Sequence, residues 1–233
     1  MDHMGNRVSR APSLTTQVHN AMRSNIMSGD LGSGERLVVD RLAKRFNVSP
    51  TPVREALARL IQDGIVEEVA PGRLHIVPVT RNYVLDTYWV RSVLEGLAAE
   101  LATNRMSSED ARRMKHLVDE GAIAIDDLDI DVYEERNQEF HSLLVTRSDN
   151  HVLSREIESL QLHVVYIRQY FLEYVSSTTD RLRKANAEHM EVAGAIADQN
   201  AHEARRLMER HIRNSGIRMG ELVQRKEGGG DQM

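Results

Sequence analysis

The sequence of 233 residues contains no cysteine, which excludes disulfide bonds and thiolate chemistry. Aromatic residues make up only 4% of the chain, with one tryptophan, and there are five prolines. No apolar stretch reaches the ~18 residues that a membrane-spanning helix needs, and no basic segment leads into an apolar signal core at the N-terminus. These absences argue against a membrane or secreted protein, and the lack of cysteine favours a cytoplasmic one.

The residues that are present are typical of a mostly helical globular protein. Hydrophobic residues make up 41% of the chain and charged residues 28%. Leu, Val, Ile, Met and Ala recur at spacings of three and four, which is the period of an amphipathic helix. The length suffices for one large domain or two modest ones.

Charge divides unevenly along the chain. The net charge is −5, but residues 1–79 carry ten Lys/Arg against eight Asp/Glu, whereas residues 80–233 carry twenty against twenty-seven. The window 36–59 holds six basic residues and two acidic ones. A basic patch on an acidic chain is typical of a nucleic-acid footprint confined to one module, although charge also fluctuates along surfaces that bind nothing.

The N-terminal third predicts a winged helix-turn-helix domain over residues 14–78, preceded by a disordered arm at 1–13. Apolar spacing predicts helices over 14–27, 39–46 and 49–62, and the last two are joined by the brief turn Asn47-Val48. After them the period changes to that of strands, which predicts a hairpin over 65–69 and 74–77. Three short helices and a hairpin make up a winged helix-turn-helix.

The third predicted helix has an unusual start. Ser49 suits the N-cap, and Pro50 and Pro52 fall in the first turn, where a missing N–H costs little. Its apolar stripe should be buried, which leaves Thr51 and Arg54 on the opposite face. The N-terminal residues of a helix in the major groove reach base edges and phosphates. The alternative is that Arg54 and its neighbour Glu55 form a solvated surface pair.

Basic residues around this helix complete the predicted DNA-binding face. Those on the preceding elements could hold phosphates, and Arg73 at the tip of the hairpin could reach an adjacent groove or the backbone. The predicted DNA contacts are Arg36, Arg41, Lys44, Arg45, Ser49, Thr51, Arg54 and Arg73.

Beyond a linker at 79–82, the rest of the chain predicts an all-helical bundle over residues 83–222, followed by a loose tail at 223–233. Helices are expected near 83–104, 108–125, 131–147, 150–175, 180–198 and 201–222. The fold class is therefore mostly α, with a small reader domain and a helical C-terminal domain.

Three histidines and an asparagine predict a metal site in this bundle. Asn137 and His141 are four residues apart and share an inward helical face. His189 and His211 flank the expected turn at Asn200 symmetrically, each about 15 Å from it along its helix. Imidazoles at matched height across a helical hairpin suit Zn²⁺, or Ni²⁺. The alternative is that these histidines only pack in the core.

Two arginines and a tyrosine are candidates for binding an anionic ligand. Arg91 precedes Glu95 by four residues, so it could serve a ligand or form an ordinary helical ion pair. Arg168 falls on an apolar stripe, where a charge is costly unless it is paired. Tyr133 shares the inward face of Asn137 and could line the cavity.

The reader sequence resembles the GntR family of bacterial transcription regulators. The resemblance covers residues 14–78 and lies mainly in "RLAKRFNVSPTPVREALARL". It implies operator contacts by Thr51 and Arg54, with Arg73 in the wing. The sequence departs from many relatives at Pro50, where they have arginine, and at Leu74, where they have glycine.

The helical part resembles the FCD effector domain of the FadR branch of that family. The matching segments are "RSVLEGLAAELA", "NQEFHSLLVTRSDNHVL" and "EHMEVAGAIADQNAHEARRLMERHI". The resemblance implies a divalent metal held by three histidines and an acidic residue, with a small carboxylate effector beside it. Asn137 stands in the acidic position, which should weaken metal binding. Arg91 matches a family arginine.

The expected function is a cytoplasmic, homodimeric, ligand-responsive regulator that represses a metabolic operon by binding a palindromic operator. An organic acid would release it. One alternative is a regulator that senses the metal itself. Another is a helical metallo-enzyme using the histidine cluster, but the chain lacks the paired Glu-x-x-His motifs of di-iron bundles and any obvious nucleophile, so no enzyme is expected.

Overall fold

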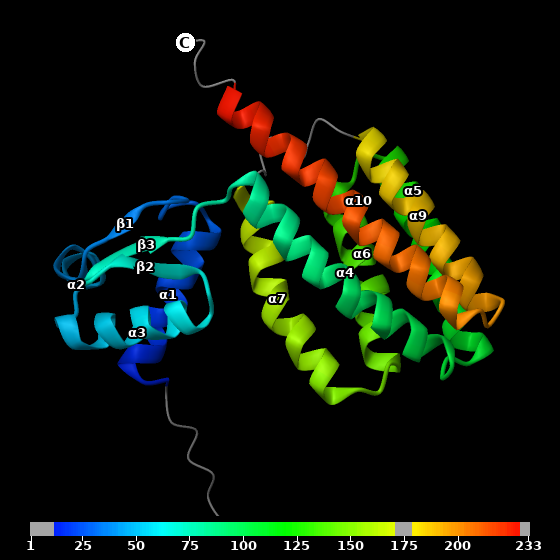
Figure 1. The fold of residues 1–233 in the computed structure, drawn as a ribbon, viewed down its shortest axis with the longest axis horizontal. Helices are drawn as coiled ribbons and strands as arrows, with labels where there is room; N and C mark the ends of the chain where they lie inside the picture. The colour runs from blue at the N-terminus through cyan, green and yellow to red at the C-terminus, as the bar shows by residue number, and fades with distance from the viewer. Residues whose placement is uncertain (1–11, 171–178, 229–233) are drawn as a thin grey trace, which may run out of the picture. The chain divides into compact units, whose positions relative to one another are not determined.

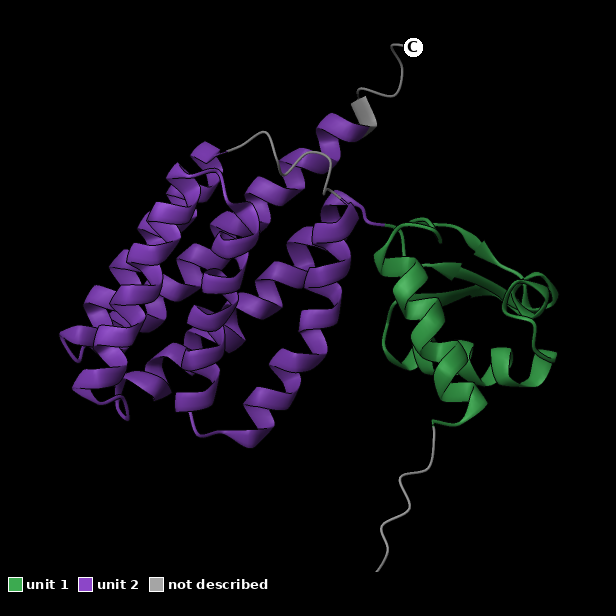
Figure 2. Cartoon of the chain, turned by 180° about the vertical axis from the view of Figure 1, so that it is seen from behind, with its two compact units in different colours: residues 1–78 green, residues 79–233 purple. Residues whose placement is uncertain are grey.

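The computed structural model describes residues 12–170 and 179–228, which belong to two compact units, 1–78 and 79–233 (Figure 1, Figure 2). The two units divide after residue 78, the position at which the sequence predicts that the reader domain ends. Most of the expected arm at 1–13, and the expected end of the fourth bundle helix at 171–175, lie outside the described residues.

Over its described residues, 12–78, the first unit has three helices and a small sheet. Its elements are α1 (Leu14–Met27), β1 (Arg36–Leu37), α2 (Val39–Phe46), α3 (Pro50–Gln62), β2 (Val66–Ala70) and β3 (Arg73–Ile76). The apolar stripes that predicted the helices form its core, with Met22 of α1, Leu42 of α2 and Leu57 of α3 at most 1% exposed. These elements form a winged helix-turn-helix, as the sequence predicts.

The turn between α2 and α3 fixes the direction of α3. Asn47 ends α2 in the left-handed conformation, with φ of 53°. Ser49 is the N-cap of α3 in an extended conformation, and Pro50 is its first residue. The Ser49 side chain makes no capping hydrogen bond, so the preset φ of proline, rather than the serine hydroxyl, stiffens this helix start.

The wing has one strand more than the sequence predicts. The sheet order is β1-β3-β2, all antiparallel, with Arg36 opposite His75 and Leu37 opposite Leu74. Two residues are too short a run for a strand period to be visible, so β1 depends on pairing with β3. The β2–β3 turn needs the positive φ of Gly72, which is 71°.

The second unit is a helical bundle. Its described helices are α4 (Arg81–Thr103), α5 (Ser108–Asp126), α6 (Ile130–Arg147), α7 (His151–Tyr170), α9 (Thr179–Ala197) and α10 (Ala201–Gly228). None of the helices in the described ranges is both long and apolar enough to cross a bilayer.

Two boundaries of the bundle differ from the prediction. Thr80 caps α4 by accepting a hydrogen bond from the backbone N–H of Tyr83, so the expected linker at 79–82 shortens to two residues. At the other end, the expected loose tail at 223–233 is wrong for its first six residues, because α10 continues to Gly228. Leu222 and Val223 are buried, and this burial stabilises the helix beyond the end at residue 222 that the sequence predicts.

Helices α4 and α10 lie side by side because glycines face the partner helix. A methyl group at Gly216 of α10 would lie 2.5 Å from Cβ of Tyr88, and one at Gly96 of α4 would lie 2.5 Å from Cγ of Glu209. Such contacts let the two backbones approach closely. This close approach places the inward face of α4 near His211 of α10.

Candidate functional sites

Helix α3 exposes the face that the sequence assigns to DNA. Thr51 and Arg54 are exposed, whereas Val53 and Leu57 on the other side are buried. Glu55 accepts a hydrogen bond of 2.5 Å from the Thr15 hydroxyl of α1. Within the described part of the chain no ion pair joins Arg54 to Glu55. The alternative, in which Arg54 and Glu55 form a surface pair, is therefore not seen.

The other predicted DNA contacts lie on the same unit and are exposed; they are Arg36, Arg41, Lys44, Arg45, Ser49 and Arg73. Two of them have local partners. Arg41 pairs with Glu35 at 2.5 Å and donates to the Arg36 carbonyl, and Arg45 donates to the Asp30 carbonyl at 3.4 Å. These contacts hold the guanidinium groups near the surface without removing their charge.

The bundle brings the three predicted histidines together. His141 of α6, His189 of α9 and His211 of α10 present nitrogen atoms that all lie within 4.8 Å of one another. The Nε2 of His189 is 3.3 Å from that of His141 and 3.0 Å from that of His211. His189 and His211 are buried, and the His141 side chain is 12% exposed. The predicted match in height across the α9–α10 hairpin is confirmed.

Two carboxylates orient these rings. Oε2 of Glu95 lies 2.5 Å from Nδ1 of His141, and Oε2 of Glu188 lies 2.8 Å from Nδ1 of His211. A carboxylate only accepts hydrogen bonds, so a neutral ring in this position carries its proton on Nδ1 and turns the lone pair of Nε2 to the centre. Glu95 and Glu188 were not predicted, because their partners lie on other helices.

The protonation states also favour a ligand site. Burial, together with the two neighbouring imidazoles, holds the pKa of His189 well below its usual value. Burial lowers the pKa of His211 to about 4 and outweighs the opposing effect of Glu188. For Glu95, burial alone would raise the pKa, but Arg91 and His141 outweigh it and keep the pKa far below its usual range. Neutral imidazoles backed by ionised carboxylates are the state that binds a metal.

The donor set fits a divalent metal ion. Two nitrogens that are each about 2.0–2.1 Å from a tetrahedral zinc ion lie about 3.3 Å apart, close to the two separations seen here. Asn137 lies one turn before His141 and lines the same cavity. Its amide nitrogen donates to Glu134 at 3.3 Å, which leaves the amide oxygen as a possible fourth ligand.

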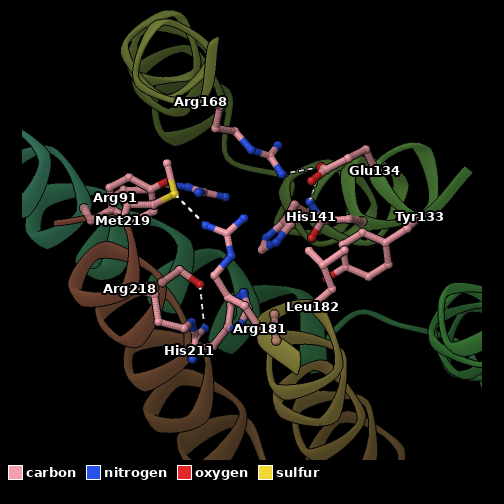
Figure 3. A pocket seen from close by; sticks show the side chains of 14 residues that line it. Arg91, Tyr133, Glu134, His141, Arg168, Arg181, Leu182, His211, Arg218 and Met219 are labelled. Carbon is pink, nitrogen blue, oxygen red and sulfur yellow. Dashed lines mark hydrogen bonds and ion pairs between the residues drawn. The ribbon is translucent and has the colours of Figure 1, made fainter. Parts of the chain in front are cut away.

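A cavity of about 80 Å³ opens beside the histidines, several times the volume that one water molecule needs (Figure 3). Each of the three residues predicted to bind an effector lines it, namely Arg91, Tyr133 and Arg168. Arg91 also pairs with Glu95 at 2.5 Å. The residue therefore forms the ordinary helical ion pair that was considered as an alternative to ligand binding, and it lines the cavity as well. Arg168 pairs with Glu134, which explains how its charge is tolerated on that stripe.

Two further arginines line the cavity and were missed from the sequence. Arg218 of α10 binds both oxygens of Glu188, at 3.0 and 2.9 Å. Arg181 of α9 donates to the sulfur of Met219 at 3.2 Å and has no carboxylate partner among the described residues. Neither stands in a motif, and only the folding of α9 and α10 against each other reveals their position.

Comparison with protein families identifies the two units. The model described as "Bacterial regulatory proteins, gntR family" matches residues 14–73, and that of the FCD domain matches residues 86–214. The chain belongs to the GntR family, in its FCD subgroup. The resemblance seen in the sequence is thereby confirmed. GntR proteins are transcription regulators, so this chain is a regulator and not an enzyme.

Several GntR regulators align over most of their length. The transcriptional regulator YdhC of Bacillus subtilis is 29% identical over 84% of this chain and 86% of its own. McbR of Escherichia coli is 30% identical over 70% of this chain and 74% of its own. A solved structure of E. coli McbR/YncC shares the fold, with a TM-score of 0.66 over 91% of this chain and 99% of that one, at 23% identity.

Proposed function

We propose that this GntR regulator represses a metabolic operon and releases its operator when a small organic acid binds beside a divalent metal in the helical unit. Two relatives, RspR and GlaR of E. coli, are named transcriptional repressors. The observation that carries the proposal is a cluster of three imidazoles, two of which, those of His141 and His211, line an arginine-rich cavity. Action on DNA in the cell implies a cytoplasmic location.

In the proposed complex with DNA, α3 enters the major groove. Thr51 and Arg54 would contact base edges, and Ser49 at the helix start would contact a phosphate. The basic residues of the surrounding elements, Arg36, Arg41, Lys44 and Arg45, would bind phosphates, and Arg73 would extend the contact from the wing. Support comes from the exposure of all eight side chains on one small unit.

The proposed metal, zinc or nickel, would be held by His141, His189, His211 and the amide oxygen of Asn137. When bound, it would supply a positive charge and an open coordination position for a carboxylate oxygen. Because Asn137 is neutral, the site lacks the charge of an acidic ligand, and modest affinity is expected. Glu95 and Glu188 contact Nδ1 of two of the rings, which leaves the Nε2 atoms of those rings for the metal.

The effector would bind between this centre and the arginines of the cavity, with Arg91 and Arg168 as anionic anchors and Tyr133 lining the wall. A ligand shifts the regulator only by its difference in affinity between two arrangements of the protein, typically 1–3 kcal/mol. The cavity is made by side chains from α4, α6, α7, α9 and α10. Occupying it would therefore change how these helices pack.

A homodimer is proposed because a palindromic operator needs two readers. An exposed apolar group on α4 supports it. Trp89, Val90 and Val93 are 55%, 53% and 46% exposed, and Ile217 of α10 is 48% exposed. Arg213 lies over the Trp89 ring at 4.6 Å, which orients the ring at the surface. A second copy of the chain is the partner that would cover this face.

The test is operator binding by the purified protein, measured on DNA from its own promoter region with and without metal and organic acids. Release by an acid only in the presence of metal is the expected result. Release by metal alone would favour the metal-sensing alternative. Failure to bind any such DNA in dilute salt would overturn the proposal, and unchanged release after removal of metal would leave the histidines a packing role.

A further inference from the structure

The cavity beside the histidines contains one arginine more than its carboxylates can neutralise. Three of its arginines are paired: Arg91 with Glu95, Arg168 with Glu134 and Arg218 with Glu188. The same carboxylates also serve other groups, since Glu95 holds His141 and Glu188 holds His211. Arg181 is the fourth, and among the described residues it has no acidic partner.

Arg181 is held in the cavity by weak contacts. Figure 3 shows its guanidinium group extending into the centre of the cavity, with a dashed line to the sulfur of Met219. A thioether is a poor acceptor for a charged donor. Its Nε is buried and has no hydrogen-bond partner within the described ranges. Burial, with the nearby charges of Arg168 and Arg218, lowers the pKa of Arg181 and outweighs the opposing effects of Tyr88 and Glu134.

An unpaired, partly buried guanidinium destabilises a folded protein unless a ligand completes it. The charge balance indicates what that ligand is. With the three ion pairs neutral, the cavity has one positive charge in excess, and a divalent metal at the histidines would add two more. A ligand with a single carboxylate could satisfy only one of these two centres.

We propose that Arg181 is the second anchoring group of the effector site, and that the effector is a small acid with two anionic groups. One carboxylate would lie at the histidine centre and the other would bind the guanidinium of Arg181. This inference rests on the proposed function, because it assumes that an acid binds beside the histidines. It adds the number of charges on that acid and a residue that selects for it.

The test compares acids of matched length with one or two carboxylates. Affinities of the zinc-loaded, full-length protein are measured by calorimetry for butanoate against succinate, and likewise for propanoate against malonate and pentanoate against glutarate. For at least one pair, the diacid should bind about 10- to 100-fold more tightly, the effect of one charge-assisted bidentate contact. Arg181→Gln should reduce that ratio to below about three-fold.

Arg183→Gln is the matched control. Arg183 lies two residues further along α9, where it is exposed and pairs with Asp126 of α5. It should keep the full preference for the diacid. Should Arg181→Gln fail to fold, Arg181→Met fills the same space without charge, and its zinc affinity, measured separately, reports whether the histidine centre is intact.

Each outcome decides the matter. Equal binding of mono- and diacids by the natural protein, or a preference that survives loss of Arg181, would overturn this inference while leaving the proposed function in place. A preference lost equally in the Arg183 variant would reduce it to a general charge effect and overturn it too. If no acid binds the zinc-loaded protein, the proposed effector site itself is wrong.

Discussion

The Nε2 atoms of His189 and His211 lie 3.0 Å apart, although the two residues are 22 positions apart in the sequence, on α9 and α10. A neutral imidazole carries a single proton, on Nδ1 or on Nε2, so its tautomer decides whether Nε2 donates or accepts. Because Glu188 accepts from Nδ1 of His211, the lone pair of that ring points at His189. A cation between the rings would bind this lone pair in place of a proton from His189.

Replacing His189 should therefore remove metal binding. His189→Ala loses a central ligand, and we expect zinc affinity to fall at least about 100-fold, since a three-histidine site becomes a two-histidine one. Calorimetry with zinc and elemental analysis of the purified variant measure it. The control is His116→Ala, at an exposed position on α5. Equal zinc binding by both variants would contradict a metal role for the cluster.

The carboxylate behind His211 should tune that affinity. Glu188→Gln keeps the shape but loses the charge that orients the ring, and loss of such a partner typically costs about 10- to 100-fold in metal affinity. Glu191→Gln is the matched control, because Glu191 lies on the same helix but pairs outward with Arg210. If both variants bind zinc like the natural protein, the orientation of His211 does not depend on Glu188.

Lowering the pH should destabilise the metal-free protein already between pH 6.5 and 4, because the buried histidines resist protonation. The pKa of His211 falls from 6.5 in the unfolded chain to about 4 in the folded one, and that of His189 shifts in the same direction. The unfolded state then binds more protons between pH 6.5 and 4, so stability is full above 6.5 and is lost as pH falls. The pKa of Glu188, about 2, matters only below 4.5.

Urea unfolding of chelator-treated protein at pH 7.5 and pH 5 measures this loss. We expect the free energy of unfolding to fall by an amount on the order of 2 kcal/mol. A His189→Ala, His211→Asn double variant should lose less between the same two pH values, because the groups that titrate are gone. A pH dependence unchanged in that variant would assign the effect to other groups.

Two substitutions, one on α3 and one on α2, should separate base contacts from general attraction to DNA. Arg54→Ala should cost about 1–3 kcal/mol on the cognate operator and much less on unrelated DNA, as expected for a base contact. Lys44→Ala should weaken both DNAs alike and reduce the salt dependence by about one phosphate contact. Anisotropy titrations over a range of salt concentrations measure both.

The control for these variants is Arg112→Ala, an exposed arginine of the helical unit. It removes the same charge from the protein at a position outside the reader. Loss of operator affinity equal to that of Arg54→Ala would show that net charge, and not the α3 face, determines binding.

The exposed α4 face should be needed for dimerisation. Trp89→Glu places a charge where an aromatic side chain would bury about 150–250 Å². The natural protein is expected at about twice its chain mass of 26.4 kDa by light scattering, and the variant at 26.4 kDa. Val152→Glu, at an exposed apolar position on α7, should leave the mass unchanged. A dimer that persists in the Trp89 variant would place the interface elsewhere.

The sequence by itself determined the features that are local. Helical periods located α1, α2 and α3 closely, because each buries a regular apolar stripe. The proline-rich start of α3 and the exposure of Thr51 and Arg54 follow from position within one helix. The His189–His211 pair was also predictable, because a short turn between two helices makes height along the hairpin a simple function of residue number.

Tertiary structure alone decided which groups surround the histidines. Glu95 lies on α4, whereas Glu188 and Arg181 lie on α9, and their contacts depend on the rotation of each helix about its axis. That rotation is set by side-chain packing, for example by the glycines that seat α10 against α4. Likewise, β1 exists because β3 supplies its hydrogen bonds, and α10 continues to Gly228 because Val223 is buried. Periodicity identifies an inward face but does not identify the residue opposite it.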